Sequence, residues 1–227
     1  PKKGEKILDL CAAPGGKTMQ LAAAGAKVTA LDLSERRLER VSENLVRTGL
    51  TAEVVAGDAL EVAEGGWDAI LLDAPCSATG TIRRHPELPF LKDGSELAEL
   101  TALQAALLDR ALGWLNPGGR LVYVTCSFLM EENEDQVASF LVDRPDFVVD
   151  DAAEAAVRSG QLTDAGAKLV RKLRRPDGSV RLTPRTAPPF TCSCRLPLQQ
   201  SAFRNQQSQS AGLWPATFLC RRWASRS

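Results

Sequence analysis

Two cysteines of this sequence each lie between an apolar run and a serine. One is in Asp73-Ala74-Pro75-Cys76-Ser77 and the other in Thr125-Cys126-Ser127. If the two runs are neighbouring strands of a parallel sheet, both thiols lie beyond strand ends and face one cleft. A thiolate there can add to carbon 6 of a pyrimidine and make carbon 5 nucleophilic toward a methyl donor. A second group must then help to remove the proton from carbon 5, so two cysteines and Asp73 suit this chemistry.

Other roles for these cysteines remain open at this point. A buried cysteine is by default a small, inert apolar side chain. Metal binding is disfavoured, because no Cys-x-x-Cys pair accompanies them and His85 is the single histidine, so we expect no metal site. Six cysteines are too few for a disulfide scaffold, and no signal peptide precedes the first apolar run. This pattern indicates a reducing, cytoplasmic compartment, where a structural disulfide is disfavoured.

A loop of small residues follows the first apolar run, Lys6–Leu10, and opens a helical pattern. The loop consists of Cys11, Ala12, Ala13, Pro14, Gly15, Gly16 and Lys17. An arrangement of strand, loop and helix lets a nucleotide approach converging backbone N–H groups. The Walker A pattern fails because Cys11 occupies the position of its first glycine, and the dinucleotide fingerprint fails on glycine spacing. S-adenosylmethionine, which has a ribose but no phosphates, remains as the predicted cofactor.

Three aspartates follow successive predicted strands. Asp32 ends the second strand, where a carboxylate can grip ribose hydroxyls. Asp58 follows the third strand, at a position suited to an adenine amino group, and Asp73 follows the fourth. A single aspartate at a strand end is more often a loop or capping residue. Three of them at successive strand ends favour a ligand site.

The elements that must position these residues alternate between strand and helix patterns. The predicted strands are Lys6–Leu10, Val28–Leu31, Glu53–Ala56, Ala69–Leu72 and Leu121–Val124, and the predicted helices begin near Lys17, after the cap Ser34, at Leu97 and at Glu131. Gly49 should end the second of these helices, and a turn at Asn116–Gly119 the third. Strands that are apolar on both faces and spaced by helices imply an α/β fold with a doubly wound, mostly parallel sheet. Such sheets bind ligands beyond the carboxyl ends of their strands.

Length and composition set the limits of this interpretation. The chain has 227 residues, of which 44% are hydrophobic and 25% charged, as in a globular protein of one large domain. Lys and Arg number 28, and so do Asp and Glu, so net charge argues neither for nor against a polyanionic partner. No apolar run approaches the roughly 18 residues that a membrane helix needs, so we expect no membrane span.

The last part of the chain has a different composition. Residues 181–227 contain seven Arg but no Asp or Glu, together with many Ser, Gln and Pro. We expect a disordered or non-native tail over 185–227, with a basic RNA-contacting arm or a folded subdomain as the alternatives. A shift of reading frame would explain this composition, and resequencing of the source DNA tests that hypothesis.

Three motifs together resemble the RNA (cytosine-5) methyltransferases of the Sun family, most closely the bacterial RsmB-type ribosomal RNA enzymes. They are Asp9–Thr18, Leu72–Gly80 and Val124–Ser127, in the family's order. The resemblance runs from about Gly4 to Pro184. It implies a Rossmann-like class I methyltransferase fold, S-adenosylmethionine as cofactor and small-subunit ribosomal RNA as substrate. It also implies a catalytic domain over 1–184 that lacks the family's upstream RNA-binding region.

The resemblance also assigns roles to single residues. It places the cofactor loop on residues 11–17, the ribose-binding acid on Asp32, the adenine-side acid on Asp58 and the motif-four acid on Asp73. Cys126 takes the place of the family's nucleophile, and Cys76 that of the cysteine that assists product release. The family's last antiparallel strand, built from Thr-Asp-Gly-Phe-Phe, is missing, and Ala216–Leu219 is a conceivable substitute.

Arg83, Arg84 and His85 follow the Cys76 loop directly. They could hold phosphates of the target nucleotide, although a solvated surface turn is an equal alternative, and no catalytic role falls to His85. We expect a monomer that methylates carbon 5 of cytosine. Transfer RNA is the nearest rival substrate. A non-catalytic remnant that keeps the cofactor fold is a rival of another class.

Overall fold

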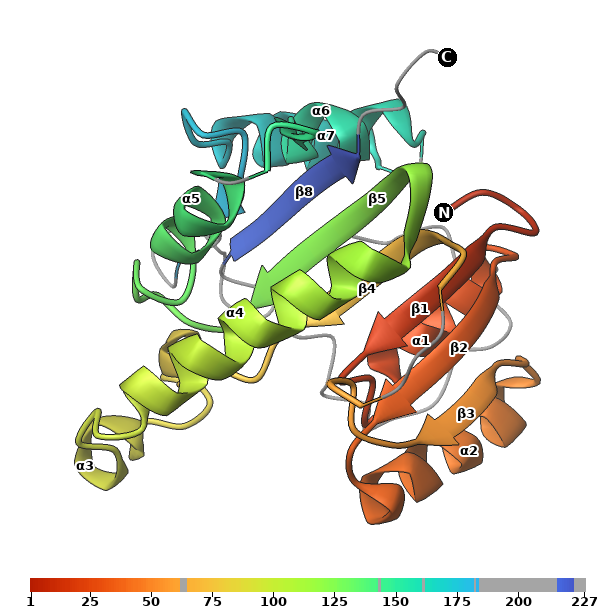
Figure 1. Cartoon of the computed structure of the whole chain (residues 1–227), viewed down its shortest axis with the longest axis horizontal. Coiled ribbons are helices and arrows are strands. Elements are labelled where there is room, and N and C mark those ends of the chain that lie inside the picture. The colour runs from red at the N-terminus through yellow and green to blue at the C-terminus, as the bar shows by residue number, and fades with distance from the viewer. Residues whose placement is uncertain (62–64, 143, 161, 182, 184–215, 223–227) are drawn as a thin grey trace.

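The computed structural model describes residues 1–61, 65–142, 144–160, 162–181, 183 and 216–222. In this part of the chain one mixed sheet has the strand order β3-β2-β1-β4-β5-β8-β6, and β7 pairs with β8 (Figure 1). Its strands are β1 (Lys6–Leu10), β2 (Lys27–Asp32), β3 (Glu53–Ala56), β4 (Trp67–Asp73), β5 (Leu115–Thr125), β6 (Phe147–Asp150), β7 (Val180–Arg181) and β8 (Ala216–Arg222).

The first five strands run parallel to one another, and β8 runs antiparallel to β5, β6 and β7. The predicted doubly wound, mostly parallel α/β sheet is therefore confirmed. The chain moves outward from β1 through β2 to β3 and then returns to place β4 on the other side of β1. Sheets with such a reversal bind ligands beyond the carboxyl ends of the strands on either side of it, which here are β1 and β4.

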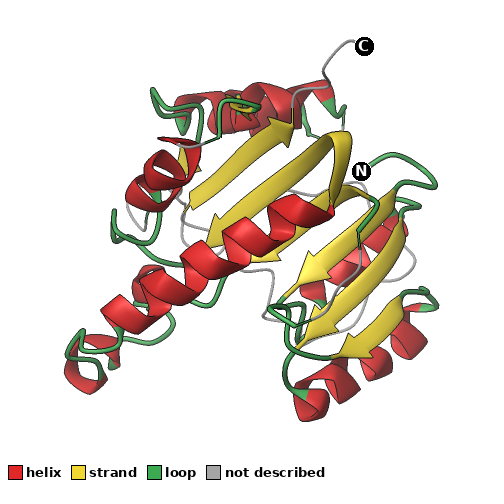
Figure 2. Cartoon of the chain, in the orientation of Figure 1, coloured by secondary structure: helices red, strands yellow, loops and turns green. Residues whose placement is uncertain are grey.

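Helices cover both faces of the sheet (Figure 2). They are α1 (Gly16–Ala23), α2 (Glu35–Thr48), α3 (Leu88–Leu91), α4 (Leu97–Trp114), α5 (Glu134–Val142), α6 (Ala152–Arg158) and α7 (Asp164–Lys172), with a 3-10 turn at Thr79–Thr81. Leu8 and Leu10 pack with α4 and α5 in the largest core cluster, whereas Ile7 packs with α1 on the opposite face. This alternation follows from the two-residue period of a strand.

The boundaries of α2 agree with the sequence signals. Ser34 accepts a hydrogen bond from the backbone N–H of Arg37 at the start of the helix. Gly49 ends the helix with a left-handed φ of 66°, a conformation that costs little without a Cβ. Ser34 and Gly49 thus cap the helix at the predicted places.

Two predicted boundaries are shifted. The helix expected from Glu131 begins at Glu134, because the residues before it form a turn in which Glu132 and Asn133 are fully buried. Asn116–Gly119, expected as a turn after α4, lies within β5, and the pairing of β4 with β5 shifts register between Trp67 and Ala69.

Strand β8 completes the sheet beside β5. Its residues Ala216–Arg221 pair with Arg120–Thr125, and β6 pairs with its other edge. The sequence signal at Ala216–Leu219 thus corresponds to a strand, with three more residues at its end. Residues 185–215 and 223–227, which make up the rest of the expected tail, lie outside the described residues.

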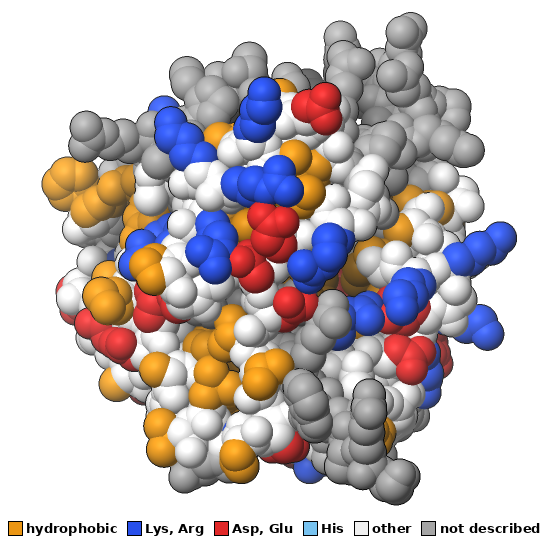
Figure 3. Space-filling model, turned by 90° about the horizontal axis from the view of Figure 1, so that it is seen from above, with side chains coloured by type: hydrophobic (Ala, Val, Ile, Leu, Met, Phe, Trp, Pro, Cys, Tyr) orange, Lys and Arg blue, Asp and Glu red, His pale blue; other side chains and the backbone are white. Residues whose placement is uncertain are grey.

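The surface of the described residues carries charges of both signs. On the face seen from above, Lys and Arg side chains lie beside Asp and Glu side chains (Figure 3). Arg171 pairs with Glu154 at 2.8 Å and Arg175 with Glu134 at 3.2 Å. In the described ranges no helix is long and apolar enough to cross a membrane.

Candidate active site

The two cysteines meet at the carboxyl ends of β4 and β5. Their Sγ atoms lie 3.3 Å apart, and the backbone N–H of Cys126 also donates to Sγ of Cys76 at 3.3 Å. The parallel register brings this about, since Asp73 at the end of β4 lies opposite Val124 near the end of β5. The sequence analysis predicts that the two thiols face one cleft, and the structure places their sulfurs at this distance.

The two thiols differ in their tendency to ionise. A hydrogen bond from Cys76 lowers the pKa of the Cys126 thiol, an effect that Lys17 supports while burial and Asp73 oppose it. The hydrogen bond to Cys126, followed by burial, raises the pKa of Cys76. One proton shared between the sulfurs therefore favours a thiolate at Cys126 and a thiol at Cys76.

The small-residue loop between β1 and α1 has a backbone shape that its sequence dictates. Gly15 precedes α1 with a φ of 94°, and a Cβ on it would lie 3.0 Å from Cγ1 of Val41 on α2. Cys11, a residue with a side chain, has a φ of 59° at the start of the loop. Such conformations cluster at ligand sites, because the surrounding structure must compensate for their cost.

Asp32, at the end of β2, is hydrogen-bonded to the backbone of this loop. Its side chain is buried, and its Oδ2 accepts a hydrogen bond of 3.0 Å from the backbone N–H of Ala13. Arg37 on α2 donates to the carbonyl of Ala13 at 2.7 Å and lies 3.7 Å from Oδ1 of Asp32. Sequence reasoning missed Arg37, because no local pattern shows that a side chain of α2 reaches the loop.

Lys17 links the loop to the thiol pair. Its Nζ lies 2.5 Å from Oδ2 of Asp73, and both side chains are largely shielded from solvent. Burial raises the pKa of Asp73, although Lys17 opposes the shift. Both charges act on Cys126, so the predicted loop and the predicted acid adjoin the predicted nucleophile.

Asp9, at the carboxyl end of β1, is fully buried beneath the loop. Its Oδ2 accepts a hydrogen bond of 2.6 Å from the Thr18 hydroxyl, and its Oδ1 has no hydrogen-bond partner among the described residues. Burial raises the pKa of Asp9 to about 7. The carboxyl group therefore lies near its ionisation point at neutral pH.

The remaining predicted residues take several positions. Burial raises the pKa of Cys11 to about 12, so this thiol is a packing group in the loop. Asp58 lies just beyond β3, which neighbours β2, and its Oδ1 accepts the backbone N–H of Leu60.

Arg83 and Arg84 are exposed in the segment after the 3-10 turn. In the same segment, Nδ1 of His85 lies 3.2 Å from a carboxylate oxygen of Glu87. The expected contact of Arg83, Arg84 and His85 with RNA stays a prediction.

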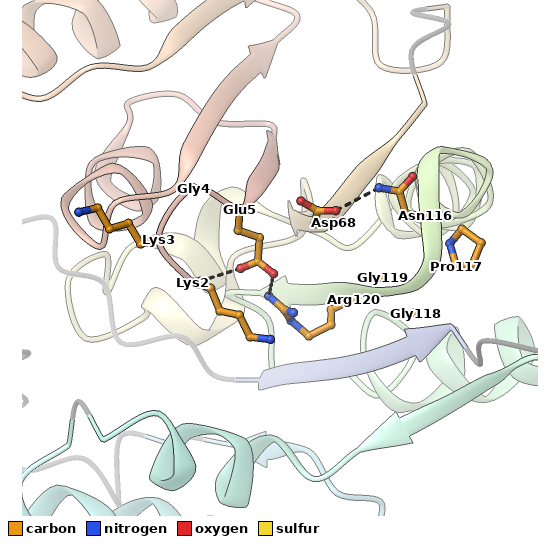
Figure 4. A pocket seen from close by; sticks show the side chains of 10 residues that line it. All are labelled: Lys2, Lys3, Gly4, Glu5, Asp68, Asn116, Pro117, Gly118, Gly119 and Arg120. Atoms are coloured by element: carbon orange, nitrogen blue, oxygen red, sulfur yellow. Dashed lines mark hydrogen bonds and ion pairs between the residues drawn. The ribbon is translucent and has the colours of Figure 1, made fainter. Parts of the chain in front are cut away.

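A cavity of about 440 Å³ opens at the opposite edge of the sheet (Figure 4). It is lined by Lys2, Lys3, Gly4, Glu5, Asp68, Asn116, Pro117, Gly118, Gly119 and Arg120. Glu5 pairs there with Arg120 at 2.5 Å, and Asn116 donates to Asp68 at 3.1 Å. Because it lies at the amino ends of β1 and β4, away from both cysteines, this cavity is not part of the candidate site. Within the described ranges no group of His, Cys, Asp and Glu has a metal-binding arrangement.

The strand order, the loop after β1 and the acids beyond the following strands define a Rossmann-like fold of the class I S-adenosylmethionine-dependent methyltransferases. More narrowly, the chain belongs to the 16S rRNA methyltransferase RsmB/F family, whose model matches residues 1–186. The resemblance of its motifs to RsmB-type enzymes is thereby confirmed.

Individual proteins support the same placement. Ribosomal RNA small subunit methyltransferase B of Salmonella agona is 54% identical over 152 residues, which are 64% of this chain and 35% of the relative. The chain therefore spans about a third of the length of the curated relatives it matches. Among solved structures, the protein PH0851 has 29% identity and a TM-score of 0.71, covering 98% of this chain and 43% of that one. A methyltransferase homolog protein from Pyrococcus horikoshii has 26% identity and a TM-score of 0.66, covering 98% and 63%.

Proposed function

We propose that this chain transfers a methyl group from S-adenosylmethionine to carbon 5 of a cytosine in small-subunit ribosomal RNA, through a covalent adduct with Cys126. The observation that carries the proposal is the thiol pair: two sulfurs 3.3 Å apart beside the cofactor loop, one of them with a lowered pKa. Family membership supports the methyl transfer and the ribosomal substrate.

The residues present fit S-adenosylmethionine. The loop of residues 11–17 leads into the N-terminus of α1, and the N-terminus of a helix is a place where backbone N–H groups can bind a polar ligand. In this proposal Asp32, at the end of β2, would accept hydrogen bonds from the ribose hydroxyls, and Asp58 would face the adenine. The orphaned Oδ1 of Asp9 offers a further acceptor beneath the loop. When bound, the cofactor supplies an electrophilic methyl group on a sulfonium.

Cys126 begins the reaction on the base. Its thiolate adds to carbon 6 of cytosine, and the new S–C bond moves electron density to carbon 5, which can then take the methyl group. The lowered pKa raises the fraction of Cys126 that is present as the reactive thiolate at a given pH. The target base must leave its stack to reach the sulfur, which favours a single-stranded or looped site.

Cys76 completes the cycle. The proton at carbon 5 passes to a general base, water or an ionised Cys76, and its electron pair restores the double bond between carbons 5 and 6 while the S–C6 bond breaks and leaves its electron pair on the Cys126 sulfur. Cys76, in contact with the sulfur of Cys126, assists this elimination and returns Cys126 to the thiolate. Asp73, paired with Lys17, keeps a negative and a positive charge at the same edge of the cleft.

The proposal is tested with the full chain, S-adenosylmethionine carrying a labelled methyl group and small-subunit ribosomal RNA. Digestion to nucleosides should recover the label in 5-methylcytidine, and Cys126→Ala should abolish it. Recovery in another nucleoside, or preferred labelling of transfer RNA, would refute the reaction or the substrate.

Titration calorimetry tests the cofactor assignment separately. S-adenosylmethionine should bind saturably and Asp32→Ala should weaken binding, with ATP as the negative control. A folded chain that does not bind S-adenosylmethionine would contradict the assignment.

A further inference from the structure

Glu132 and Asn133 are two adjacent, fully buried polar residues that the reaction above does not use. They lie in the turn between β5 and α5. Burying a carboxylate is unfavourable unless hydrogen bonds satisfy it. The partners of these two residues therefore indicate what their burial accomplishes.

Glu132 holds the loop that carries Cys76. Its Oε1 accepts the backbone N–H of Ser77 at 2.8 Å, and its Oε2 accepts the Ser77 hydroxyl at 2.5 Å. Gln104 on α4 donates to the same Oε1 at 3.1 Å and to the carbonyl of Pro75 at 2.8 Å. The residues on both sides of Cys76 are thus tied, directly or through Gln104, to one carboxylate.

Asn133 holds the loop that carries Cys126. Its Oδ1 accepts the Thr125 hydroxyl at 2.7 Å, and its Nδ2 donates to the carbonyls of Ser127 at 3.2 Å and Leu129 at 2.6 Å. Since Glu132 and Asn133 are consecutive, the two cysteine loops share one anchoring turn. The separation of the two sulfurs therefore depends on this turn.

A chain of hydroxyl groups connects the loops as well. Ser77 Oγ and Thr79 Oγ1 each lie 3.1 Å from Ser127 Oγ. Because the one hydroxyl proton of Ser77 goes to Glu132, Ser127 must donate to Ser77, and Thr79 must then donate to Ser127. The carboxylate of Glu132 thus sets the direction of every hydrogen bond from Thr79 to Ser77.

We propose that Glu132 is a positioning residue that, through Ser77, holds the Cys76 sulfur against the Cys126 sulfur. The inference rests on the proposed function, in which these sulfurs act as assistant and nucleophile. A glutamine of the same size cannot replace Glu132, because both carboxylate oxygens of Glu132 accept hydrogen bonds and a glutamine amide has only one oxygen. If the amide NH2 faced the Ser77 hydroxyl, that hydroxyl would have to accept, and the direction of the chain to Thr79 would reverse. If the NH2 faced the N–H of Ser77 and the amide of Gln104, buried donors would face one another without an acceptor.

The test compares Glu132→Gln with Glu131→Gln, a matched change at the exposed neighbouring glutamate. The rate at which iodoacetamide alkylates Cys126 is measured against pH by mass spectrometry, which needs neither RNA nor cofactor. Glu132→Gln should move the profile upward by about one pH unit, so alkylation at neutral pH slows roughly tenfold. Glu131→Gln should follow the wild type.

Two further readouts separate positioning from folding. Glu132→Gln should bind S-adenosylmethionine as the wild type does, because the side-chain hydrogen bonds of Glu132 go to Ser77 and Gln104, which lie outside the cofactor loop. Its kcat for methylation should fall at least tenfold with an unchanged KM for RNA. If Glu132→Gln does not fold, Ser77→Ala, which removes only the hydroxyl link, should shift the alkylation profile in the same direction.

An alkylation profile of a folded variant that matches the wild type would overturn the proposal. This readout does not depend on methylation. An inactive wild-type chain whose Cys126 profile still shifts with Glu132→Gln would therefore contradict the proposed function and leave the positioning role supported.

Discussion

The backbone N–H of Cys126 points at the sulfur of Cys76, and the sulfur of Cys126 lies 3.3 Å from the same atom. The sulfur of Cys76 is therefore in hydrogen-bond contact with both the backbone and the side chain of Cys126. The pair can hold one negative charge at a time, because two adjacent thiolates in a shielded cleft repel each other. Charge on one sulfur thus requires a proton on the other.

This pairing predicts that Cys76→Ala traps the covalent adduct. The variant keeps the nucleophile but lacks the group that assists elimination, so a complex of protein and RNA should survive denaturation on a gel. The assay uses small-subunit ribosomal RNA and S-adenosylmethionine, with the wild type as the comparison. Adding Cys126→Ala to the same variant should abolish the complex. Persistence of the complex in the double variant would assign the nucleophile to another residue.

The same pairing predicts a pH effect that needs no substrate. Cys76 lowers the pKa of Cys126 by donating a hydrogen bond to its thiolate, so Cys76→Ala should raise that pKa. Alkylation of Cys126 should then reach half of its maximal rate at a higher pH than in the wild type. Mass spectrometry of the alkylated peptide measures both profiles. A lower midpoint in Cys76→Ala would contradict the lowering of the Cys126 pKa by Cys76.

Gly15 in the cofactor loop and Gly49 at the end of α2 are matched positions for testing that loop by substitution. Both have left-handed φ, at 94° and 66°, so alanine at either position costs about 1–2 kcal/mol of stability. A Cβ at Gly15 would also lie 3.0 Å from Val41, whereas nothing lies within 4 Å of one at Gly49. Gly15→Ala should weaken S-adenosylmethionine binding at least tenfold in calorimetry, and Gly49→Ala should leave it unchanged. Equal affinities for the two variants would contradict this role of the loop.

From the raised pKa of Asp9 we expect the stability of the fold to depend on pH. Burial raises its pKa in the folded chain to about 7, against 3.8 for the ordinary group. The folded state therefore keeps a proton that the unfolded state loses, and its stabilising effect is complete below about pH 4. The effect declines as the pH rises to about 7, by about 1.4 kcal/mol per pH unit and ~4 kcal/mol in total.

Denaturant unfolding of the wild type and of Asp9→Asn at pH 5 and pH 8 measures this dependence. The variant lacks the titrating group, so its free energy of unfolding should gain on that of the wild type as the pH rises. Asp164→Asn, at an exposed aspartate of α7, controls for the loss of one carboxylate. A difference between wild type and Asp9→Asn that is constant with pH would contradict the buried, protonated state of Asp9.

The sequence by itself determined the fold class and most of the candidate site. Strands apolar on both faces require a sheet covered by helices on both sides, and motifs placed just beyond such strands must meet at one edge. Asp73, Cys76 and Cys126 could therefore be predicted as neighbours, and Asp32 as a residue at the same edge of the sheet. Local chemistry also predicted the caps of α2 at Ser34 and Gly49, since a side-chain acceptor and a left-handed φ act within one turn.

Other features depended on contacts between distant parts of the chain. The guanidinium of Arg37 on the loop, the orphaned oxygen of Asp9 and the shared turn of Glu132 and Asn133 have no local signature. The later start of α5 and the place of β8 between β5 and β6 are of the same kind. Only the tertiary structure decided these features, because a buried polar group takes whichever partner the packing brings within hydrogen-bond distance.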